Sequence, residues 1–282
     1  TESTELLSFS FFFQLSDMKL FPLFRRKNSL PPKPITASVS SDDSPQPIIL
    51  RTLLIVYDPT VDKTSGKKLS EYMQWNNVDD LTKGYIDDIL QVSSGLVQYQ
   101  ITERIDVDAF PAKVDGYVYD AQTFIDVLRG ASRPYMPQEA DYYAIIKHFD
   151  VLQRVANNEI DEVWVFSFPH AGFYESIMGG PDAFWCNSGP LIHTEASQRR
   201  FVIMGFSYER GVGEMLENMG HRAESIMEKT FEKLTGDDNL WNRFIRYEKT
   251  HPGRAALGNV HFAPNSDQDY DWGNTSTVMS EC

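Results

Sequence analysis

Four stretches of the chain carry apolar patterns that are typical of β-strands. Residues 48–57 form a nearly continuous apolar run that ends at Asp58, which predicts a strand buried on both faces of a sheet. Residues 96–107 alternate between apolar and polar side chains and predict a second strand with one wetter face. Residues 162–168 and 201–206 are the third and fourth predicted strands. The pattern leaves open whether the fourth strand is parallel or is an antiparallel edge strand.

Between these strands, apolar residues recur with the period of amphipathic helices. This spacing predicts helices over residues 78–92, 121–128, 141–157 and 211–234. Strands that alternate with helices indicate the α/β class. We therefore expect a single α/β domain, with a central mixed, mostly parallel sheet of about four to five strands flanked by helices.

Composition suggests the boundaries of this domain. Residues 28–48 are rich in proline and serine, which is typical of an extended linker. We read residues 1–48 as a disordered extension and linker, residues 49–274 as the α/β domain, and residues 275–282 as a C-terminal tail. A plausible start at Met18 and an abrupt end at Cys282 suggest an upstream extension and a longer natural chain.

The net charge and the hydropathy of the chain argue against a nucleic-acid partner and against a membrane-spanning segment. The formal net charge is −14, whereas nucleic-acid binding requires a basic face, so we expect no nucleic-acid partner. No run reaches the roughly 18 apolar residues of a membrane-spanning helix, so we expect no transmembrane segment. An exported location is favoured over a cytoplasmic one, and the sequence leaves the oligomeric state open.

The predicted helix 211–234 carries the most suggestive chemistry. Its apolar residues fill one face, and Glu214, Glu217, His221, Glu224 and Glu228 form a stripe opposite. Glu217, His221 and Glu224 follow i, i+4 and i, i+3 steps, so their side chains can reach one point. Helices present metal ligands at this spacing. A solvated surface is the competing interpretation, but these carboxylates would repel one another without a nearby cation.

Further candidate residues lie in loops. His261 follows the helix along the chain and is our first choice for the ligand that completes a site with His221 and Glu217. Such a site would bind a divalent metal, with zinc preferred, and Glu224 or Glu214 would be the general base. The candidate substrate-binding residues come from the loop after the third strand and from the acidic, aromatic run near the C-terminus. They are His170, Tyr174, Glu175, Trp185 and Trp272.

Three functions fit these residues. The first is a metal-dependent hydrolase that acts on a peptide or a glycan. The second is a metal-free, glycan-acting enzyme that uses two carboxylates of the stripe and Glu175, with Trp185 or Trp272 stacking on sugars. The third is a non-catalytic binding module with an aromatic cleft. If no second polar element faces the stripe, both enzyme hypotheses fail and the binding module remains.

Several segments resemble a family of uncharacterised bacterial proteins. They are DEVWVF (residues 161–166), GFYES (172–176), FWCNS (184–188), and residues 201–228 with 258–272. The likeness covers residues 50–274 and implies no activity. The architecture also resembles that of zincin metallopeptidases, in which the last strand leads into a helix that carries the motif His-Glu-x-x-His. Here the motif reads Glu217-Asn218-Met219-Gly220-His221, so only His221 matches and the general base would lie elsewhere.

Overall fold

The computed structural model describes residues 45–271 and 273–281. Its main sheet has the strand order β4-β1-β5-β7-β6, and a small hairpin is separate from it. The predicted disorder of residues 1–44 lies outside the described residues. The strands are β1 Ile48–Tyr57, β2 Thr60–Asp62, β3 Lys67–Lys68, β4 Val97–Val107, β5 Glu162–Ser167, β6 Ser176–Gly179 and β7 Phe201–Ser207.

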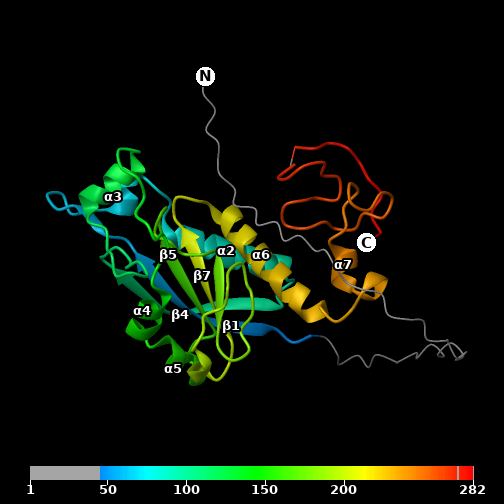
Figure 1. Ribbon diagram of the computed structural model, residues 1–282, viewed down its shortest axis with the longest axis horizontal. Helices are drawn as coiled ribbons and strands as arrows, with labels where there is room; N and C mark the ends of the chain where they lie inside the picture. Colours follow the sequence, from blue (N-terminus) through cyan, green and yellow to red (C-terminus); the bar gives the residue numbers. More distant parts are fainter. Residues whose placement is uncertain (1–44, 272, 282) are drawn as a thin grey trace, which may run out of the picture. The chain divides into compact units, whose positions relative to one another are not determined.

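Helices cover both faces of the main sheet, which confirms the α/β class with a mostly parallel sheet (Figure 1). Helices α2 and α6 lie beside each other on one face, and α4 and α5 lie on the other. The helices are α1 Leu69–Met73, α2 Val78–Val92, α3 Ala121–Leu128, α4 Tyr142–His148, α5 Val151–Ala156, α6 Val212–Phe231 and α7 Leu240–Phe244, with 3₁₀ turns at Glu195–Ser197 and Gly236–Asp238.

The strand directions resolve what the apolar pattern left open. Strand β1 pairs in parallel with β4 and β5, and β7 pairs in parallel with β5. The predicted fourth strand is therefore parallel. The antiparallel edge strand is β6, which lies in the segment predicted as a loop. With four residues and a glycine at its end, β6 carries too little apolar pattern to be recognised from the sequence.

The predicted helix 141–157 is two helices in the structure. Asp150, between α4 and α5, has a φ of 51°, which is left-handed and cannot continue a helix. The apolar period runs through this break and conceals it. The bounds of α2 and α3 agree with the prediction, and both helices begin at a side-chain cap, Asn77 for α2 and Asp120 for α3.

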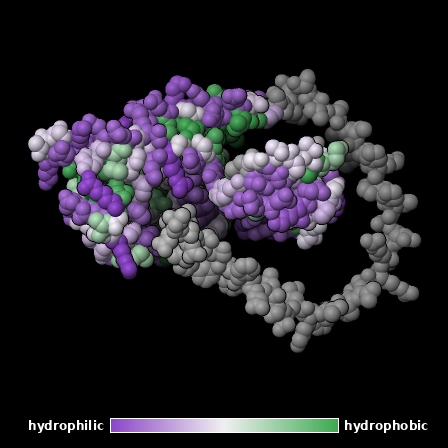
Figure 2. Space-filling model, turned by 90° about the horizontal axis from the view of Figure 1, so that it is seen from above, coloured by the Kyte–Doolittle hydropathy of each residue, from purple (hydrophilic) through white to green (hydrophobic). Residues whose placement is uncertain are grey.

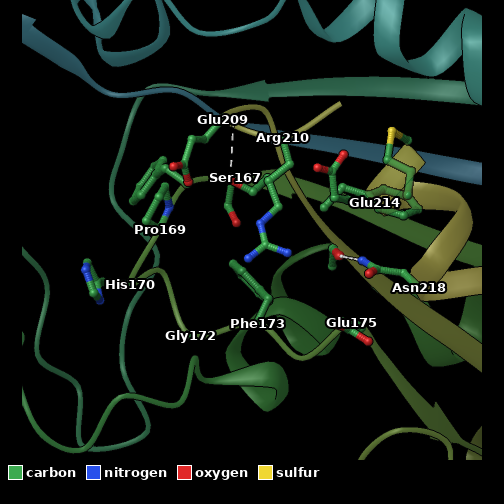
Figure 3. A pocket seen from close by; sticks show the side chains of 15 residues that line it. Ser167, Pro169, His170, Gly172, Phe173, Glu175, Glu209, Arg210, Glu214 and Asn218 are labelled. Carbon is green, nitrogen blue, oxygen red and sulfur yellow. Dashed lines mark hydrogen bonds between the residues drawn. The ribbon is translucent and has the colours of Figure 1, made fainter. Parts of the chain in front are cut away.

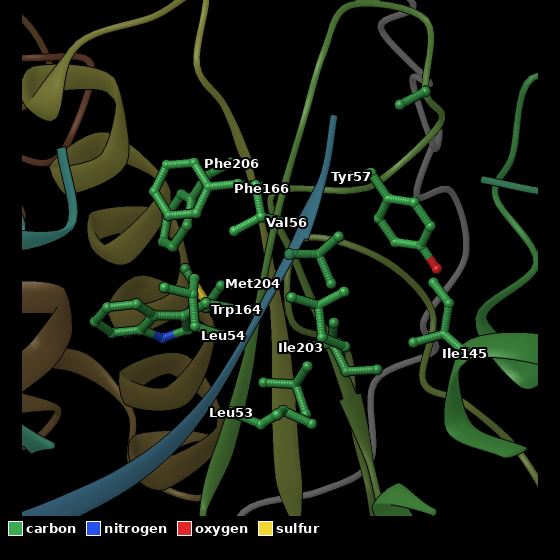
Figure 4. Close-up of a cluster of buried hydrophobic side chains, with 14 of the residues drawn as sticks. Leu53, Leu54, Val56, Tyr57, Ile145, Trp164, Phe166, Ile203, Met204 and Phe206 are labelled. Carbon is green, nitrogen blue, oxygen red and sulfur yellow. The ribbon is translucent and has the colours of Figure 1, made fainter. Parts of the chain in front are cut away.

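The core lies on both sides of the parallel strands (Figure 4). Strand β5 is buried along its whole length, as expected for a strand covered by helices on both faces. Trp164 and Phe206 lie on one side and contact the Tyr85 ring of α2. Ile203 and Tyr57 lie on the other side, toward α4.

The sequence left open whether the face of α6 opposite its apolar face is solvated. In the structure, both faces of this helix are covered. It lies between the sheet and the C-terminal residues. On the sheet side, Asn218 donates to the Gly205 carbonyl at 3.0 Å, and Arg222 forms an ion pair with Glu162. Its opposite side is covered by the segment that follows α7. Polar as well as apolar positions of this helix are therefore shielded from solvent.

The predicted C-terminal tail also differs in the structure. Ser280 pairs with Ala255, and the N–H of Glu281 donates to the Ala255 carbonyl at 2.8 Å. The described end of the chain is therefore attached to the segment after α7. Hydrophilic residues cover most of the face drawn in Figure 2. Among the described helices, none is long and apolar enough to cross a membrane.

Candidate metal centre

One side of α6 carries the carboxylates and the histidine of the predicted stripe. The helix starts directly after β7, and the Glu214 carboxylate accepts a hydrogen bond from the Gly211 N–H at 3.0 Å at its first turn. Glu217, His221 and Glu224 follow on the next two turns. They are partly buried, because the C-terminal segment lies against them.

The C-terminal segment reaches α6 at a glycine. A Cβ atom on Gly220 would lie 2.6 Å from the Val260 side chain, so any larger residue would force the two apart. The Val260 N–H donates to Glu224 Oε1 at 2.9 Å. The next residue is His261, and this contact brings its ring to His221.

Three ligand atoms converge between the helix and this segment. The Nε2 atoms of His221 and His261 are 3.0 Å apart, and Glu217 Oε1 lies 3.8 and 3.7 Å from them. A triangle with these sides has one point about 2.05 Å from all three atoms, the distance at which zinc binds imidazole nitrogen and carboxylate oxygen. Glu217, His221 and His261 could therefore hold a metal ion.

The far nitrogens of both imidazoles face carboxylates. His221 Nδ1 is 3.1 Å from Glu224 Oε2, and His261 Nδ1 is 3.0 Å from Asp269 Oδ1. A carboxylate accepts the proton of the ring, so each Nδ1 donates and each Nε2 presents a lone pair to the shared point. Metal-binding histidines in proteins have such carboxylate partners, which fix the ring and its tautomer.

Tyr270 is the fourth group at this point. Its hydroxyl donates to Glu217 Oε1 at 2.6 Å and lies 3.0 Å from His261 Nε2. Burial and the hydrogen bond to Glu217 raise the pKa of Tyr270. The phenol is therefore neutral near pH 7. Its single hydroxyl proton can be donated to Glu217 or to His261, but not to both at once.

The electrostatics of the cluster favour positive charge. The hydrogen bond to Glu224 raises the pKa of His221 against the effect of burial, and the charges of Glu175, Glu224 and Glu217 add to it. Burial opposes ionisation of Glu224, but hydrogen bonds from His221 and the Val260 N–H lower its pKa. Several carboxylates thus surround lone-pair-bearing nitrogens, an arrangement that a divalent cation would stabilise.

A second pocket lies one to two helical turns away along α6, at the carboxyl ends of β5 and β7 (Figure 3). It has a volume of about 280 Å³, with His170 at one end and Glu214 and Asn218 at the other. Glu175 also lines it and accepts a hydrogen bond from Asn187 at 2.8 Å. Asn218 lines this pocket and directly follows Glu217 in α6, so the pocket lies beside the metal cluster.

The remaining predicted residues are more dispersed. His170 lines the second pocket, and burial, with the charge of Lys113, lowers its pKa. The Tyr174 ring stacks on Tyr142, and Trp185 is exposed. Trp272 lies outside the described residues. The structure thus brings together Glu217, His221, Glu224 and His261, while Glu214 caps the helix.

Sequence reasoning missed the roles of Asp269 and Tyr270. Both belong to the acidic, aromatic run that follows His261, which was the available signal. The Tyr270 N–H donates to the His261 carbonyl at 3.1 Å. The loop between them therefore makes a turn that brings Asp269 and Tyr270 back to the histidine. The spacing along the chain does not reveal this turn.

Comparisons with known proteins add no relative. No family model, no curated protein and no solved structure matches this chain. The resemblances to the uncharacterised bacterial family and to the zincins stay predictions. The geometry of the cluster is therefore the basis for any functional conclusion.

Proposed function

We propose that this protein is a zinc-dependent hydrolase whose metal ligands are His221, His261 and Glu217. The observation that carries the proposal is the single point about 2.05 Å from all three ligand atoms, together with the carboxylate behind each histidine. Two imidazoles and one carboxylate form a ligand set of catalytic zinc sites, in which water takes the fourth position. Zinc held by these residues would lower the pKa of its water and polarise a substrate carbonyl.

The surrounding residues then have distinct roles. Both oxygens of Glu224 are engaged, by His221 and by the Val260 N–H, so Glu224 holds the histidine in place. Asn218 occupies the position of the zincin glutamate, but it is buried and donates to Gly205. We assign the general base to Glu175, which lines the pocket beside the cluster together with Asn218, the residue after Glu217 in α6.

For a peptide substrate, the water oxygen would form a bond to the carbonyl carbon while Glu175 accepts the water proton. The carbon–nitrogen bond would then break, and the same proton would pass to the departing amine. The Tyr270 hydroxyl would turn from Glu217 to donate its hydrogen bond to the oxyanion that forms in between.

Metal analysis of the purified full-length chain tests the proposal. We expect about one zinc per chain by mass spectrometry of the metal content, and background levels in His221→Ala and His261→Ala. His251→Ala is the matched control, because His251 is exposed and its ring contacts the Thr250 hydroxyl rather than the cluster. We expect hydrolysis of casein peptides that 1,10-phenanthroline abolishes and added zinc restores.

Other results would point elsewhere. Background metal in the wild-type chain contradicts the zinc site and leaves the carboxylate enzyme and the binding module. Iron in place of zinc contradicts hydrolysis, because two histidines and one carboxylate also hold iron in oxygenases.

A further inference from the structure

An apolar groove opens beside the metal cluster, between α6 and the C-terminal segment. It has a volume of about 670 Å³. Helix α6 contributes one wall, and α7 and the loop after it contribute the other. The apolar residues that line it are Ala223, Met227, Phe231, Leu240, Trp241, Phe244, Leu257 and Val260.

The rim of the groove is unusually exposed for such large apolar side chains. Leu240 is 56% exposed, Leu257 50% and Phe244 45%. Exposed apolar residues that gather in one groove mark a binding surface more often than single exposed residues do. Because these residues are exposed, the groove opens to solvent at its rim and differs from the enclosed tunnel that an acyl chain would fill.

The groove adjoins residues of the metal cluster. A smaller pocket of about 220 Å³ is lined by His221 and His261. Glu224, Trp241 and Asn259 line both this pocket and the groove. The groove thus lies beside two of the three ligand residues, and a substrate whose scissile bond lies at the metal would extend into it.

Several polar groups along the groove are already engaged. The N–H groups of Leu257 and Gly258 donate to the carbonyls of Phe244 and Arg246. The Asn259 side chain accepts from the N–H groups of His261 and Phe262. The buried Nε1 of Trp241 has no partner among the described residues and could bind one acceptor. Sugar hydroxyls would find few replacements here for their hydrogen bonds to water, whereas apolar side chains would be stabilised by burial.

Resting on the proposed function, we infer that the substrate is a peptide with large apolar side chains next to the scissile bond, and that these side chains occupy the groove. This assigns the substrate class as peptide rather than glycan. The volume exceeds that of one side chain, so we expect two neighbouring apolar residues, such as Leu and Phe, to be recognised together.

Binding to the metal-free, full-length chain tests the inference without catalysis. The probe is a capped, fluorescein-labelled hexapeptide with adjacent Leu and Phe, compared with the same peptide carrying two Ser. We expect fluorescence anisotropy to detect binding of the first peptide only. Ala223→Trp, which fills the groove, and Leu257→Asp, which makes its exposed rim polar, should each weaken binding about tenfold or more.

Val92→Asp is the matched control, because Val92 is an exposed apolar residue at the end of α2, outside the groove. Unchanged affinity in both groove variants overturns the inference. So does a chain that binds chitotriose or dodecanoate but not the Leu-Phe peptide.

Cleavage-site mapping on a tryptic peptide mixture gives the second readout. The zinc-loaded chain should cut beside Leu, Phe or Met, and Ala223→Trp should lose this preference while its zinc content stays the same. Zinc-dependent cleavage without such a preference overturns only the groove assignment. Peptide binding without zinc or cleavage overturns the proposed function and leaves the groove as a peptide-binding site.

Discussion

The sheet with its helices and the segment after α6 are built on different principles. In residues 48–231, apolar side chains fill the space between strands and helices, and regular hydrogen bonds join the strands. In residues 240–281, α7 is followed by loops held by side chains, as where the Asn265 amide donates to the Asn274 and Ser276 carbonyls. The metal cluster takes ligands from both regions. Stability and metal chemistry should therefore respond to different substitutions.

The largest effect on stability should come from the ion pair between α6 and the sheet. Glu162 is only 2% exposed, and Arg222→Ala leaves its charge buried with the Trp164 N–H but without its ionic partner. We expect a loss of about 3–5 kcal/mol in the free energy of unfolding, measured by urea denaturation of the metal-free chain. Arg133→Ala, at an exposed arginine, should change it by less than about 0.5 kcal/mol. A loss below about 1 kcal/mol for Arg222→Ala would show that the pair is not needed to hold the helix to the sheet.

Zinc binding should raise the free energy of unfolding, because its ligands come from both regions. At a free zinc concentration about 100 times the Kd, the free energy of unfolding should rise by about 2.7 kcal/mol, because only the folded chain assembles the site. The same zinc concentration should stabilise His261→Ala far less, although its sheet is intact. Equal stabilisation of both chains would mean that zinc binds somewhere else.

The carboxylates behind the histidines should tune zinc affinity without supplying ligands. Glu224→Gln and Asp269→Asn should each weaken zinc binding about 10–100-fold, measured by competition with a chelating dye. The effect should be larger for Glu224, whose side chain is 24% exposed, than for Asp269, at 56%. Glu228→Gln lies on the same stripe but is exposed, and it should leave the affinity unchanged. Loss of affinity in all three would indicate a general charge effect.

The smallest expected effect is a dependence of sheet stability on acid. Burial alone would raise the pKa of Asp161, but hydrogen bonds from Arg51 and Arg199 outweigh it and lower the pKa to about 2. In the unfolded chain this pKa is about 3.9. The carboxylate therefore stabilises the fold above about pH 4, and its contribution of about 1–2 kcal/mol is lost as the pH falls toward 2.

Comparison with Asp161→Asn isolates this contribution. The stability difference between wild type and variant should be present at pH 5 and should shrink markedly by pH 2.5. A difference that stays constant between these two pH values would contradict the lowered pKa.

Much of the sheet could be predicted, because strands that are buried on both faces consist of long apolar runs. Such runs predicted strands β1, β5 and β7, whereas the helical period of apolar residues predicted α2. The break at Asp150 could not be predicted, because the apolar period continues through it. Strand β6 was missed because its four residues carry too short an apolar pattern, and its pairing with β7 is a tertiary contact that the sequence does not show.

The cluster was predictable in part. The spacing of Glu217 and His221 on one helix is local, so the sequence expresses it directly. That His261 reaches them depends on the approach of Val260 to Gly220, a tertiary contact without a periodic signal. Whether the stripe of α6 meets solvent or a second element could not be decided from the sequence, because the loops that cover it carry no regular pattern.

The division of the cluster between α6 and the segment after it also determines when the cluster can form during synthesis. During synthesis, every strand of the main sheet and the whole of α6 precede His261 and Tyr270. At ordinary translation rates, the roughly forty residues between the end of α6 and Tyr270 take about 2–8 s to appear. A nascent chain can therefore complete its sheet before it can assemble the cluster. Metal capture would then follow the formation of the sheet.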